Sequence, residues 1–503
     1  MFFYNKHHKG LRKTVLPGLL LCFSVFIGLF APATALADTA AAPTSEASAE
    51  ASATGIADTY HWPTGPQISA EGAILIEAET GAVLFEKNAT ERFYPASTTK
   101  LMTALLALEN AALGETVTVS HNAVYDIDVD SSRIWVDVGE ELSMQDSLYA
   151  LMLPSANDLA YAIAEHVSGT MPAFAELMNT RAAELGCVNT HFMNPHGLDE
   201  DEHYTCPADL AKITRPLLKN STFVKISGSR NYEIKPTNLC KDSRWVLNTH
   251  LMIRGTQPYE GIIAGKTGHT DLAGANLVTC ARRGTMTLIA VIMKAPDDTA
   301  LYNDTAALLN YGFDNFTTYS VAEEQLATGS DVPPLFHSED TVQKTNRDII
   351  STDSGVVVLP FSAALSDTRK TVSLSQLSSF AEGKNTIGTV TYTYGSRVIG
   401  FAHIVYDNEG PAFTIDTTSE TAPEVQPPGT PGNAPQEDIL SENPLQGEDT
   451  KTEDTPKGDR KALIIGIILG CICFFIGIYF VFVELPYRKK RAAYLAKRRN
   501  GRR

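Results

Sequence analysis

A long apolar run near the C-terminal end limits how this chain can be organised. Residues Ala462–Val483 are 22 consecutive residues without a charged side chain. As a helix with a rise of about 1.5 Å per residue, this run is roughly 33 Å long, enough to cross the hydrocarbon core of a bilayer. Nine lysines and arginines follow it, and the positive-inside rule places such a flank in the cytoplasm. The sequence therefore predicts a transmembrane helix at 462–483, in contact with membrane lipid, and a basic cytoplasmic tail at 484–503.

The N-terminal segment predicts export of the residues that follow it. Basic residues come first, the apolar stretch Val15–Phe30 comes next, and the small-residue site Ala35–Ala37 closes the segment. This is the order of a secretory signal peptide, so residues 1–37 are expected to be cleaved off before Asp38. The chain between the two apolar runs is then expected to lie outside the membrane.

The composition excludes several classes of protein. Hydrophobic residues make up 44% of the chain and charged residues 20%, as in ordinary globular proteins. These values exclude a wholly disordered chain, a collagen-like fibre and a polytopic membrane protein. The formal net charge of −17 makes the chain a poor ligand for polyanions, so no nucleic acid is expected as a partner.

Two linkers divide the exported part. Residues 38–57 are rich in Ala, Ser and Thr, and predict a flexible arm. Residues 412–460 are rich in Pro, Asp and Glu, and predict a disordered, acidic stalk. Two folded parts remain, a larger domain at 58–322 and a smaller one at 323–411.

The larger part contains patterns for both helices and strands. Apolar runs around the Glu79–Gly81 turn predict a hairpin over Gly72–Lys87, and helical periodicity runs from Ser97 to about Asn110 with Leu101, Leu105 and Leu108 on one face. The other expected elements are helices near Met144–Leu153, Asp158–Val167, Pro172–Leu185, Pro207–Leu218 and Thr299–Tyr311, and strands at Ala275–Ala281 and Thr285–Met293. Helices between strands from the two ends predict an α+β domain with an antiparallel sheet.

The smaller part predicts an all-β domain. Its β-type runs are Val356–Pro360, Thr371–Leu374, Gly388–Tyr394 and Val398–Val405. Gly395 and Ser396 fit a hairpin turn between the last two runs.

Four of the seven cysteines fall in the expected exported domain, namely Cys187, Cys206, Cys240 and Cys280. Export permits disulfides, and Cys187 and Cys206 are near enough in sequence to close a short loop. Four cysteines allow three pairings, between which the sequence does not choose, and buried free thiols are the alternative.

The first of three short motifs is Ser97-Thr98-Thr99-Lys100. On a helix, residues i and i+3 share a face, so the Ser97 hydroxyl is expected beside the Lys100 amine. A serine hydroxyl is a weak nucleophile until a base takes its proton, and a lysine whose pKa is lowered by burial and a nearby cation is such a base. Taken alone, the motif also fits a plain serine N-cap.

The second motif is Ser155-Ala156-Asn157, at the entry to an expected helix. A hydroxyl and an amide two residues apart at such an entry can both point into a cleft, where Ser155 would relay a proton and Asn157 would hold Lys100. An ordinary capping turn is the alternative.

The third motif is Lys266-Thr267-Gly268, followed by His269, at the expected start of a strand. Glycine at position 268 lets a substrate backbone approach closely. Lys266 offers a cation, and Thr267 a hydroxyl, to a carboxylate. A surface turn is the alternative.

The three motifs together are far more specific than any one of them. Their order, SxxK, SxN and KTG, matches the active-site serine signature of β-lactamases and penicillin-binding proteins. The chain resembles the low-molecular-mass penicillin-binding proteins, the serine-type D-Ala-D-Ala carboxypeptidases of peptidase family S11. The supporting stretches are Tyr94–Thr103, Leu153–Asp158, Asn189–Leu198 and Gly265–Thr270. The resemblance covers about 60–320, and more weakly the small β domain as far as about 410.

The resemblance implies a fold and an activity. The fold is a β-lactamase/D,D-peptidase-like catalytic domain followed by a small all-β domain. The activity is the removal of the terminal D-Ala from peptidoglycan stem peptides in bacterial cell-wall biogenesis, with β-lactam antibiotics as inhibitors and without metal or cofactor. The enzyme would be anchored once in the bacterial plasma membrane, with its catalytic domain outside and its C-terminus in the cytoplasm.

The resemblance also implies the role of each site residue. Ser97 would form the acyl-ester, Lys100 would accept its proton, and Ser155 and Asn157 would complete the proton network. The substrate carboxylate would be bound by a further set, Lys266, Thr267 and Gly268. The backbone N–H groups of Ser97 and His269 would form the oxyanion hole.

Other functions are compatible with these motifs. Some are different enzymes with the same fold, and one is not an enzyme. A D,D-endopeptidase, a transpeptidase or a β-lactamase would use the same three motifs, although no deacylating Glu of a β-lactamase is identified. A non-enzymatic penicillin-binding sensor would signal through the tail at 484–503, which is too short for a folded signalling domain. The expected stalk and spanning helix also differ from the amphipathic membrane helix with which many family members end.

Other polar and aromatic residues favour a structural role. One group lies close in sequence but matches no metal motif, namely His191, His196, Asp199, Glu202 and His203. The three tryptophans, Trp62, Trp135 and Trp245, are expected to pack in the core or at its rim rather than to bind glycans.

Overall fold

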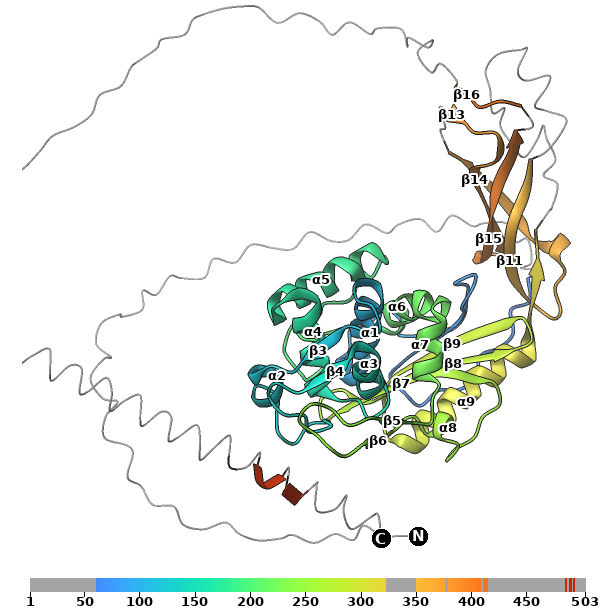
Figure 1. Cartoon of the computed structure of the whole chain (residues 1–503). Coiled ribbons are helices and arrows are strands. Elements are labelled where there is room, and N and C mark those ends of the chain that lie inside the picture. Colours follow the sequence, from blue (N-terminus) through green and yellow to red (C-terminus); the bar gives the residue numbers. More distant parts are fainter. Residues whose placement is uncertain are drawn as a thin grey trace, which may run out of the picture. The chain divides into compact units, whose positions relative to one another are not determined.

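The computed structural model describes residues 60–322, 350–375, 379–408, 410–414 and, near the C-terminus, 485, 488–490, 492 and 493 (Figure 1). The expected signal peptide, arm and apolar run at 462–483 lie outside these residues, as does the stalk from 415 on. Within the described residues, no helix is both long and apolar enough to cross a membrane.

An antiparallel sheet forms the centre of the N-terminal body, residues 60–315. Among the described residues, five strands lie in the order β2-β1-β9-β8-β7. These strands are β1 (Gly72–Glu77), β2 (Val83–Lys87), β7 (Ile262–Thr270), β8 (Gly274–Arg283) and β9 (Met286–Ala295). Because β1 pairs with β9, the two ends of the body meet in one sheet and the segments between them cover it.

Both faces of this sheet are apolar, so helices pack on both (Figure 1). Neighbouring side chains on a strand point to opposite faces, and Ile74 and Ile76 of β1 therefore join one core cluster while Leu75 joins the other. The first cluster packs under α1 (Lys100–Asn110), α3 (Met144–Met152), α4 (Asn157–Ser168), α5 (Met171–Glu184) and α6 (Pro207–Lys219). The second packs under α9 (Asp298–Asn315).

The predicted hairpins and helices of this body are confirmed, with three corrections. The residues Ala96–Thr99 form a 3-10 turn, η1, and the α-helix begins at Lys100 rather than at Ser97. Helix α1 is buried on nearly all sides and not on one face, because it runs through the middle of the first core cluster. Lys266 lies in the middle of β7 and not at its start.

Several short elements had no counterpart in the sequence analysis. They are α2 (His121–Tyr125), α7 (Ser221–Ser227) and α8 (Leu251–Arg254), with two antiparallel strand pairs, β3 (Thr116–Thr118) with β4 (Glu141–Ser143) and β5 (Asn231–Ile234) with β6 (Arg244–Leu247). Elements of three to seven residues are too short for a hydrophobic period to be read from them. Trp245 on β6 is 59% exposed, so the expectation that every tryptophan packs in the core or at its rim is wrong for Trp245.

A second antiparallel sheet follows, and its predicted β-type runs are confirmed. In the described part of the chain it has five strands in the order β10-β11-β15-β14-β12. They are β10 (Phe316–Ser320), β11 (Ile350–Pro360), β12 (Arg369–Leu374), β14 (Gly383–Tyr394) and β15 (Arg397–Asn408), and a further small pair joins β13 (Ser379–Phe380) to β16 (Phe413–Thr414). Gly395 forms the β14–β15 turn with φ +60°. Strand β10 ends at Ser320, before residue 323, where the smaller domain was predicted to begin. The second sheet therefore includes a strand from the predicted larger domain.

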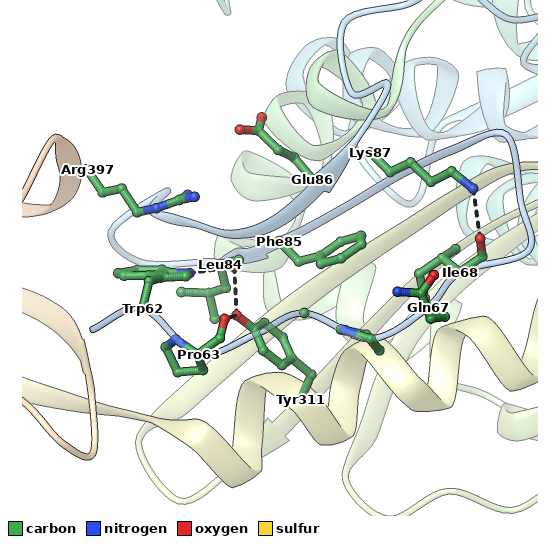
Figure 2. Close-up of a pocket in the computed structure, with 12 residues that line it drawn as sticks. Trp62, Pro63, Gln67, Ile68, Leu84, Phe85, Glu86, Lys87, Tyr311 and Arg397 are labelled. Carbon is green, nitrogen blue, oxygen red and sulfur yellow. Dashed lines mark hydrogen bonds between the residues drawn. The ribbon is translucent and has the colours of Figure 1, made fainter. Parts of the chain in front are cut away.

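Trp62 lies where the second sheet contacts the N-terminal body. Its indole N–H donates to the Leu84 carbonyl at 3.1 Å, its ring lies 5.0 Å from that of Phe316, and the Arg397 guanidinium lies 4.7 Å above it. Trp62 also lines an open groove of about 380 Å³ between β2, α9 and β15 (Figure 2). None of the three motifs lines this groove, so it is the joint between two packed units and not a candidate active site.

The four cysteines of the described region are all free thiols. Cys187, Cys206 and Cys280 are buried, and burial raises the pKa of the Cys187 and Cys206 thiols to about 12. Of the possibilities that the sequence left open, the structure has free thiols.

Two buried histidines join elements that are distant in sequence. His203 accepts the Met193 N–H at Nδ1, so its proton is on Nε2 and donates to the Thr99 hydroxyl at 2.9 Å. Nε2 of His250 lies 2.9 Å from the Thr279 hydroxyl on β8. Burial lowers the pKa of each imidazole to about 3, and both are therefore neutral in the folded protein.

We expect these histidines to make the fold acid-sensitive. The pKa of each imidazole is about 6.5 in the unfolded chain and about 3 in the folded chain. Above pH 6.5 the imidazole is neutral in both states and the fold keeps its full stability. As the pH falls from 6.5 towards 3, only the unfolded chain takes up the proton, so the free energy of unfolding decreases. Each histidine contributes a slope of up to about 1.4 kcal/mol per pH unit. Thermal unfolding of the full chain between pH 7.0 and 5.0 measures this, because few carboxylates titrate there. His203→Gln is expected to lower the melting temperature at pH 7.0 but to weaken its dependence on pH; an unchanged dependence would contradict the assignment.

Candidate active site

The SxxK motif folds into the turn that begins the central helix. Residues i and i+3 are eclipsed in a 3-10 turn, and the Ser97 Oγ and Lys100 Nζ atoms lie 3.0 Å apart. The turn is entered through Ala96 at φ +48°, a conformation that is strained for a residue other than glycine. The expected contact between the serine hydroxyl and the lysine amine is present, although the helix type at Ser97 differs from the prediction.

Lys100 is fully buried, and its amine is held by two oxygen acceptors. It donates to Asn157 Oδ1 at 2.6 Å and to the His196 carbonyl at 2.6 Å. Burial lowers the pKa of Lys100 well below its usual value, nearby Lys266 lowers it further, and the buried carboxyl of Asp158 opposes the shift. The structure therefore favours a neutral amine at Lys100.

A neutral amine has two N–H donors and one lone pair. Asn157 Oδ1 and the His196 carbonyl are acceptors, so they take the two donors of Lys100. The lone pair is left for the remaining neighbour, the Ser97 hydroxyl at 3.0 Å. The geometry thus orients Lys100 to remove the proton of Ser97.

The SxN motif lies between α3 and α4. Ser155 has φ +64°, and its buried Oγ has no hydrogen-bond partner among the described residues. The backbone N–H of Asn157 donates to the Ser132 carbonyl at 2.7 Å, which fixes the start of α4. Backbone strain and an orphaned buried hydroxyl are typical of positions where a ligand supplies the missing partner.

The KTG motif provides a second buried lysine on β7. Lys266 is 1% exposed, its amine donates to the Thr267 carbonyl at 2.8 Å, and burial lowers its pKa to about 7. The Thr267 hydroxyl lies 2.7 Å from that of Thr249, in the segment after β6. His269 is exposed at the end of the strand. A buried cation with a single neutral partner is suited to an anionic ligand.

Gly268 allows β7 to approach the serine turn. A Cβ atom at this position would lie 2.9 Å from the Pro95 carbonyl oxygen and 3.1 Å from the Ser97 nitrogen. On the neighbouring strand, the Asn276 side chain donates to the Tyr94 and Pro95 carbonyls at 2.9 and 3.1 Å. The turn that carries Ser97 is thus clamped against the sheet beside the third motif.

Three contributors to the site were not predicted from the sequence. The His196 carbonyl was not considered, since backbone acceptors leave no compositional signal. Gly197 has φ +86°, and a Cβ there would meet the Ala96 carbonyl oxygen, so this glycine lets its loop pack against the serine turn. The Asp158 carboxylate accepts the N–H groups of Ile134 and Trp135 at 3.1 and 3.0 Å, and burial raises its pKa. All three residues lie in stretches that carry the family resemblance, Asp158 in Leu153–Asp158 and the other two in Asn189–Leu198.

The histidine-rich segment does not form a metal site in the described residues. No group of three or more His, Cys, Asp or Glu side chains there could hold an ion. Nδ1 of His191 lies 2.7 Å from the Glu202 carbonyl, and both ring nitrogens of His203 have protein partners. These histidines hold together the loop that supplies the His196 carbonyl.

Comparison with known proteins agrees with this geometry. The family model described as D-alanyl-D-alanine carboxypeptidase, Peptidase_S11, matches residues 59–297. D-alanyl-D-alanine carboxypeptidase DacF of Bacillus subtilis is 34% identical over 50% of this chain and 64% of its own length, so the chain spans less than two thirds of that relative. The same holds for DacA of Haemophilus influenzae, at 33% identity and 66% of its length.

Two other relatives are covered more fully. The crystal structure of penicillin binding protein 5 from Haemophilus influenzae superposes with a TM-score of 0.55 at 27% identity, over 69% of this chain and 99% of that one. The D-alanyl-D-alanine carboxypeptidase of Streptomyces sp. strain K15 is 35% identical over 50% of this chain and 89% of its own length. From this similarity and the three motifs in one site, we conclude that the chain belongs to peptidase family S11, the D-alanyl-D-alanine carboxypeptidases.

Proposed function

We propose that this protein is a penicillin-sensitive D-Ala-D-Ala carboxypeptidase that acts on peptidoglycan stem peptides. The observation that carries the proposal is the buried Lys100, whose amine lies 2.6 Å from Asn157 Oδ1, 2.6 Å from the His196 carbonyl and 3.0 Å from the Ser97 hydroxyl. In the neutral amine the first two contacts use both N–H donors, which leaves the lone pair for Ser97. A hydroxyl with its own buried base is the requirement for acyl transfer through a serine ester.

Acylation begins with proton transfer. Lys100 takes the proton of Ser97 as its Oγ attacks the carbonyl carbon of the penultimate D-Ala. The negative charge that develops on the carbonyl oxygen is stabilised by the backbone N–H groups of Ser97 and His269. Support for this pair comes from Gly268, the residue before His269, which permits the close approach of β7 to the Ser97 nitrogen. Lys100 then passes this proton to the Ser155 hydroxyl, which gives its own proton to the leaving amine as the C–N bond breaks.

Deacylation repeats these steps with water. Lys100, neutral again once its proton has gone to the leaving amine, takes a proton from a water molecule that attacks the ester. The tetrahedral intermediate collapses, Ser97 regains its proton, and the shortened peptide leaves. The same residues therefore serve both halves of the reaction, without metal or cofactor.

The KTG motif accounts for the choice of substrate. Lys266 supplies the cation, and Thr267 the hydroxyl, that a free terminal carboxylate needs beside the scissile bond. A β-lactam presents a similar carboxylate and a strained amide, so it is expected to acylate Ser97 as well. A transpeptidase or an endopeptidase would use the same groups with a different acceptor or leaving group, and a sensor would be acylated without turnover.

Replacement of the nucleophile tests this proposal. Ser97→Ala is expected to lower the release of D-Ala from an acyl-D-Ala-D-Ala peptide by at least about 10³-fold, because no other hydroxyl is paired with Lys100 in the described site. It is also expected to abolish covalent labelling by a fluorescent penicillin. Ser379→Ala, at an exposed position on β13, is the matched control. Undiminished release in Ser97→Ala would refute the nucleophile. Penicillin labelling without D-Ala release by the unmodified protein would favour the sensor.

The two lysines predict a bell-shaped pH dependence of kcat/KM. The reaction needs neutral Lys100 and protonated Lys266, so kcat/KM rises as Lys100 loses its proton and falls as the pH passes the Lys266 pKa of about 7. Lys266→Arg keeps the charge at all accessible pH values. Its rate is expected to be lower, but the alkaline decline should move to higher pH. An alkaline limb at the same pH in both proteins would assign that limb to another group.

We also propose that residues 462–483 anchor the enzyme in the bacterial plasma membrane, with the catalytic domain outside and residues 484–503 in the cytoplasm. The 22 uncharged residues and the nine cations after them support this. A chain that ends at residue 461 is expected to leave the membrane fraction with its D-Ala release intact. Retention of this shortened chain in carbonate-washed membranes would argue against the anchor.

A further inference from the structure

Asn276 is a fully buried polar side chain that belongs to none of the three motifs. It lies on β8, directly opposite Gly268 of the KTG motif. Its Nδ2 donates to the Tyr94 and Pro95 carbonyls at 2.9 and 3.1 Å, and its Oδ1 accepts the Lys294 N–H at 2.7 Å. One side chain thus joins the segment before the serine turn to β8 and β9 of the central sheet.

The partners of Asn276 permit only one orientation of its amide. A backbone carbonyl can only accept a hydrogen bond, and a backbone N–H can only donate one. The carbonyls of Tyr94 and Pro95 therefore require the amide nitrogen on their side, and the Lys294 N–H requires the amide oxygen on the other. Rotation of the amide by half a turn would break all of these hydrogen bonds. The direction in which Asn276 donates is therefore set by its surroundings.

An irregularity in β9 holds the amide in this orientation. The pairing of β8 with β9 shifts in register between Ala275 and Leu277, where β9 has one more residue than β8. This part of β9 includes Lys294, whose backbone lies in the left-handed region at φ +56°. Bulges re-aim nearby groups and are frequent beside active sites. Here the backbone N–H of Lys294 meets the side chain of Asn276.

Asn276 acts on Ser97 through the Pro95 carbonyl. This carbonyl also accepts the N–H and the hydroxyl of Thr98, at 3.3 and 2.7 Å, which close the 3-10 turn. Gly268 packs against the same group, since a Cβ atom there would lie 2.9 Å from the Pro95 oxygen and 3.1 Å from the Ser97 nitrogen. The amide of Asn276 thus holds the Ser97 N–H at a fixed place beside β7.

We infer that Asn276 is a positioning residue of the oxyanion hole. The inference rests on the proposed function, in which the N–H groups of Ser97 and His269 stabilise the developing negative charge. His269 directly follows Gly268 on β7, so one donor lies on the turn that Asn276 holds and the other on the strand beside that turn. A displacement of about 1 Å in such a group can lower a rate about 10²-fold. A sheet residue outside the motifs therefore keeps the two donors in place relative to each other.

The contacts of Asn276 reach the oxyanion hole and not the rest of the site. Among the hydrogen bonds of the described residues, none joins Asn276 to Lys100, Lys266 or Thr267. The oxyanion exists only during the reaction, so its donors contribute to the rate of acylation and not to the binding of the unreacted ligand. Loss of Asn276 is therefore expected to slow acylation and to leave ligand binding and the pH dependence unchanged.

Acylation of the full chain in detergent by benzylpenicillin tests the inference, with rates counted per site that reacts. Asn276→Leu keeps much of the side-chain volume, removes its hydrogen bonds, and is expected to lower the maximal acylation rate about 30-fold. The half-saturating penicillin concentration is expected to change less than about 2-fold, and the limbs of the pH dependence should not move. Asn276→Ser is a milder change that retains a short donor, and it is expected to lower the rate about 3-fold.

A control on the far face of the sheet separates positioning from stability. Thr305→Val removes a buried hydroxyl that donates to the Leu301 carbonyl at 2.8 Å on α9. It is expected to lower the melting temperature without changing the acylation rate; a slower rate in this variant would show that the rate follows stability and would overturn the inference.

Other outcomes would also overturn the positioning role. They are an unchanged rate in both Asn276 variants, a loss confined to the number of reactive sites, and a parallel rise in the half-saturating concentration. Each of these leaves the proposed function intact. Failure of the unmodified protein to react with penicillin and to release D-Ala would overturn the proposed function, and with it this inference.

Discussion

Lys100 is buried, and among the described residues no carboxylate contacts its amine, which sets the chemistry of the whole site. A charged ammonium in that position would be costly, so the protein favours the neutral amine and supplies only neutral oxygens to it. Lys266 adds a second positive group nearby and strengthens the same preference. Asp158, whose charge opposes this preference, has a raised pKa of its own because it is buried too. Basicity at Lys100 is thus a property of the packed domain and not of the SxxK motif alone.

The fold places the three motifs on different supports. Ser97 lies in the 3-10 turn before the buried helix that Lys100 begins, Ser155 and Asn157 lie at the turn into α4, and Lys266 lies in a strand. Movement of any one support is restricted by hydrogen bonds to another. The Asn276 side chain ties the serine turn to the sheet, and His203 ties the same turn to the loop that carries His196. Strained conformations at Ala96 and Ser155 can persist because their surroundings hold them.

Much of the fold and of the candidate site could be predicted from the sequence. The parts that could not be predicted were missed for physical reasons. The hairpins, the long helices and the α+β class followed from hydrophobic period, and the three motifs named the side chains that meet. The His196 carbonyl and the clamp by Asn276 were not accessible, since they arise from backbone positions and strand neighbours that only the tertiary fold brings together. The position of Lys266 within β7 was misjudged because Gly265 and Gly268 resemble strand boundaries, whereas here Gly268 serves the close approach to Ser97. The exposure of Trp245 on β6 was missed because a four-residue strand carries too little periodic signal.

The contacts around the serine turn span long stretches of sequence, and this bears on when the site can form. Lys100 reaches its carbonyl acceptor 96 residues later, Thr99 meets His203 after 104, and Asn276 contacts Tyr94 across 182. Such non-local contacts form late in folding, because the loops between them must close first. As the chain emerges from the ribosome, Ser97 is therefore an ordinary hydroxyl until β7 and β8 have docked beside it. A nascent chain with its N-terminal half complete contains the whole SxxK motif, yet it has none of the environment that makes the serine reactive.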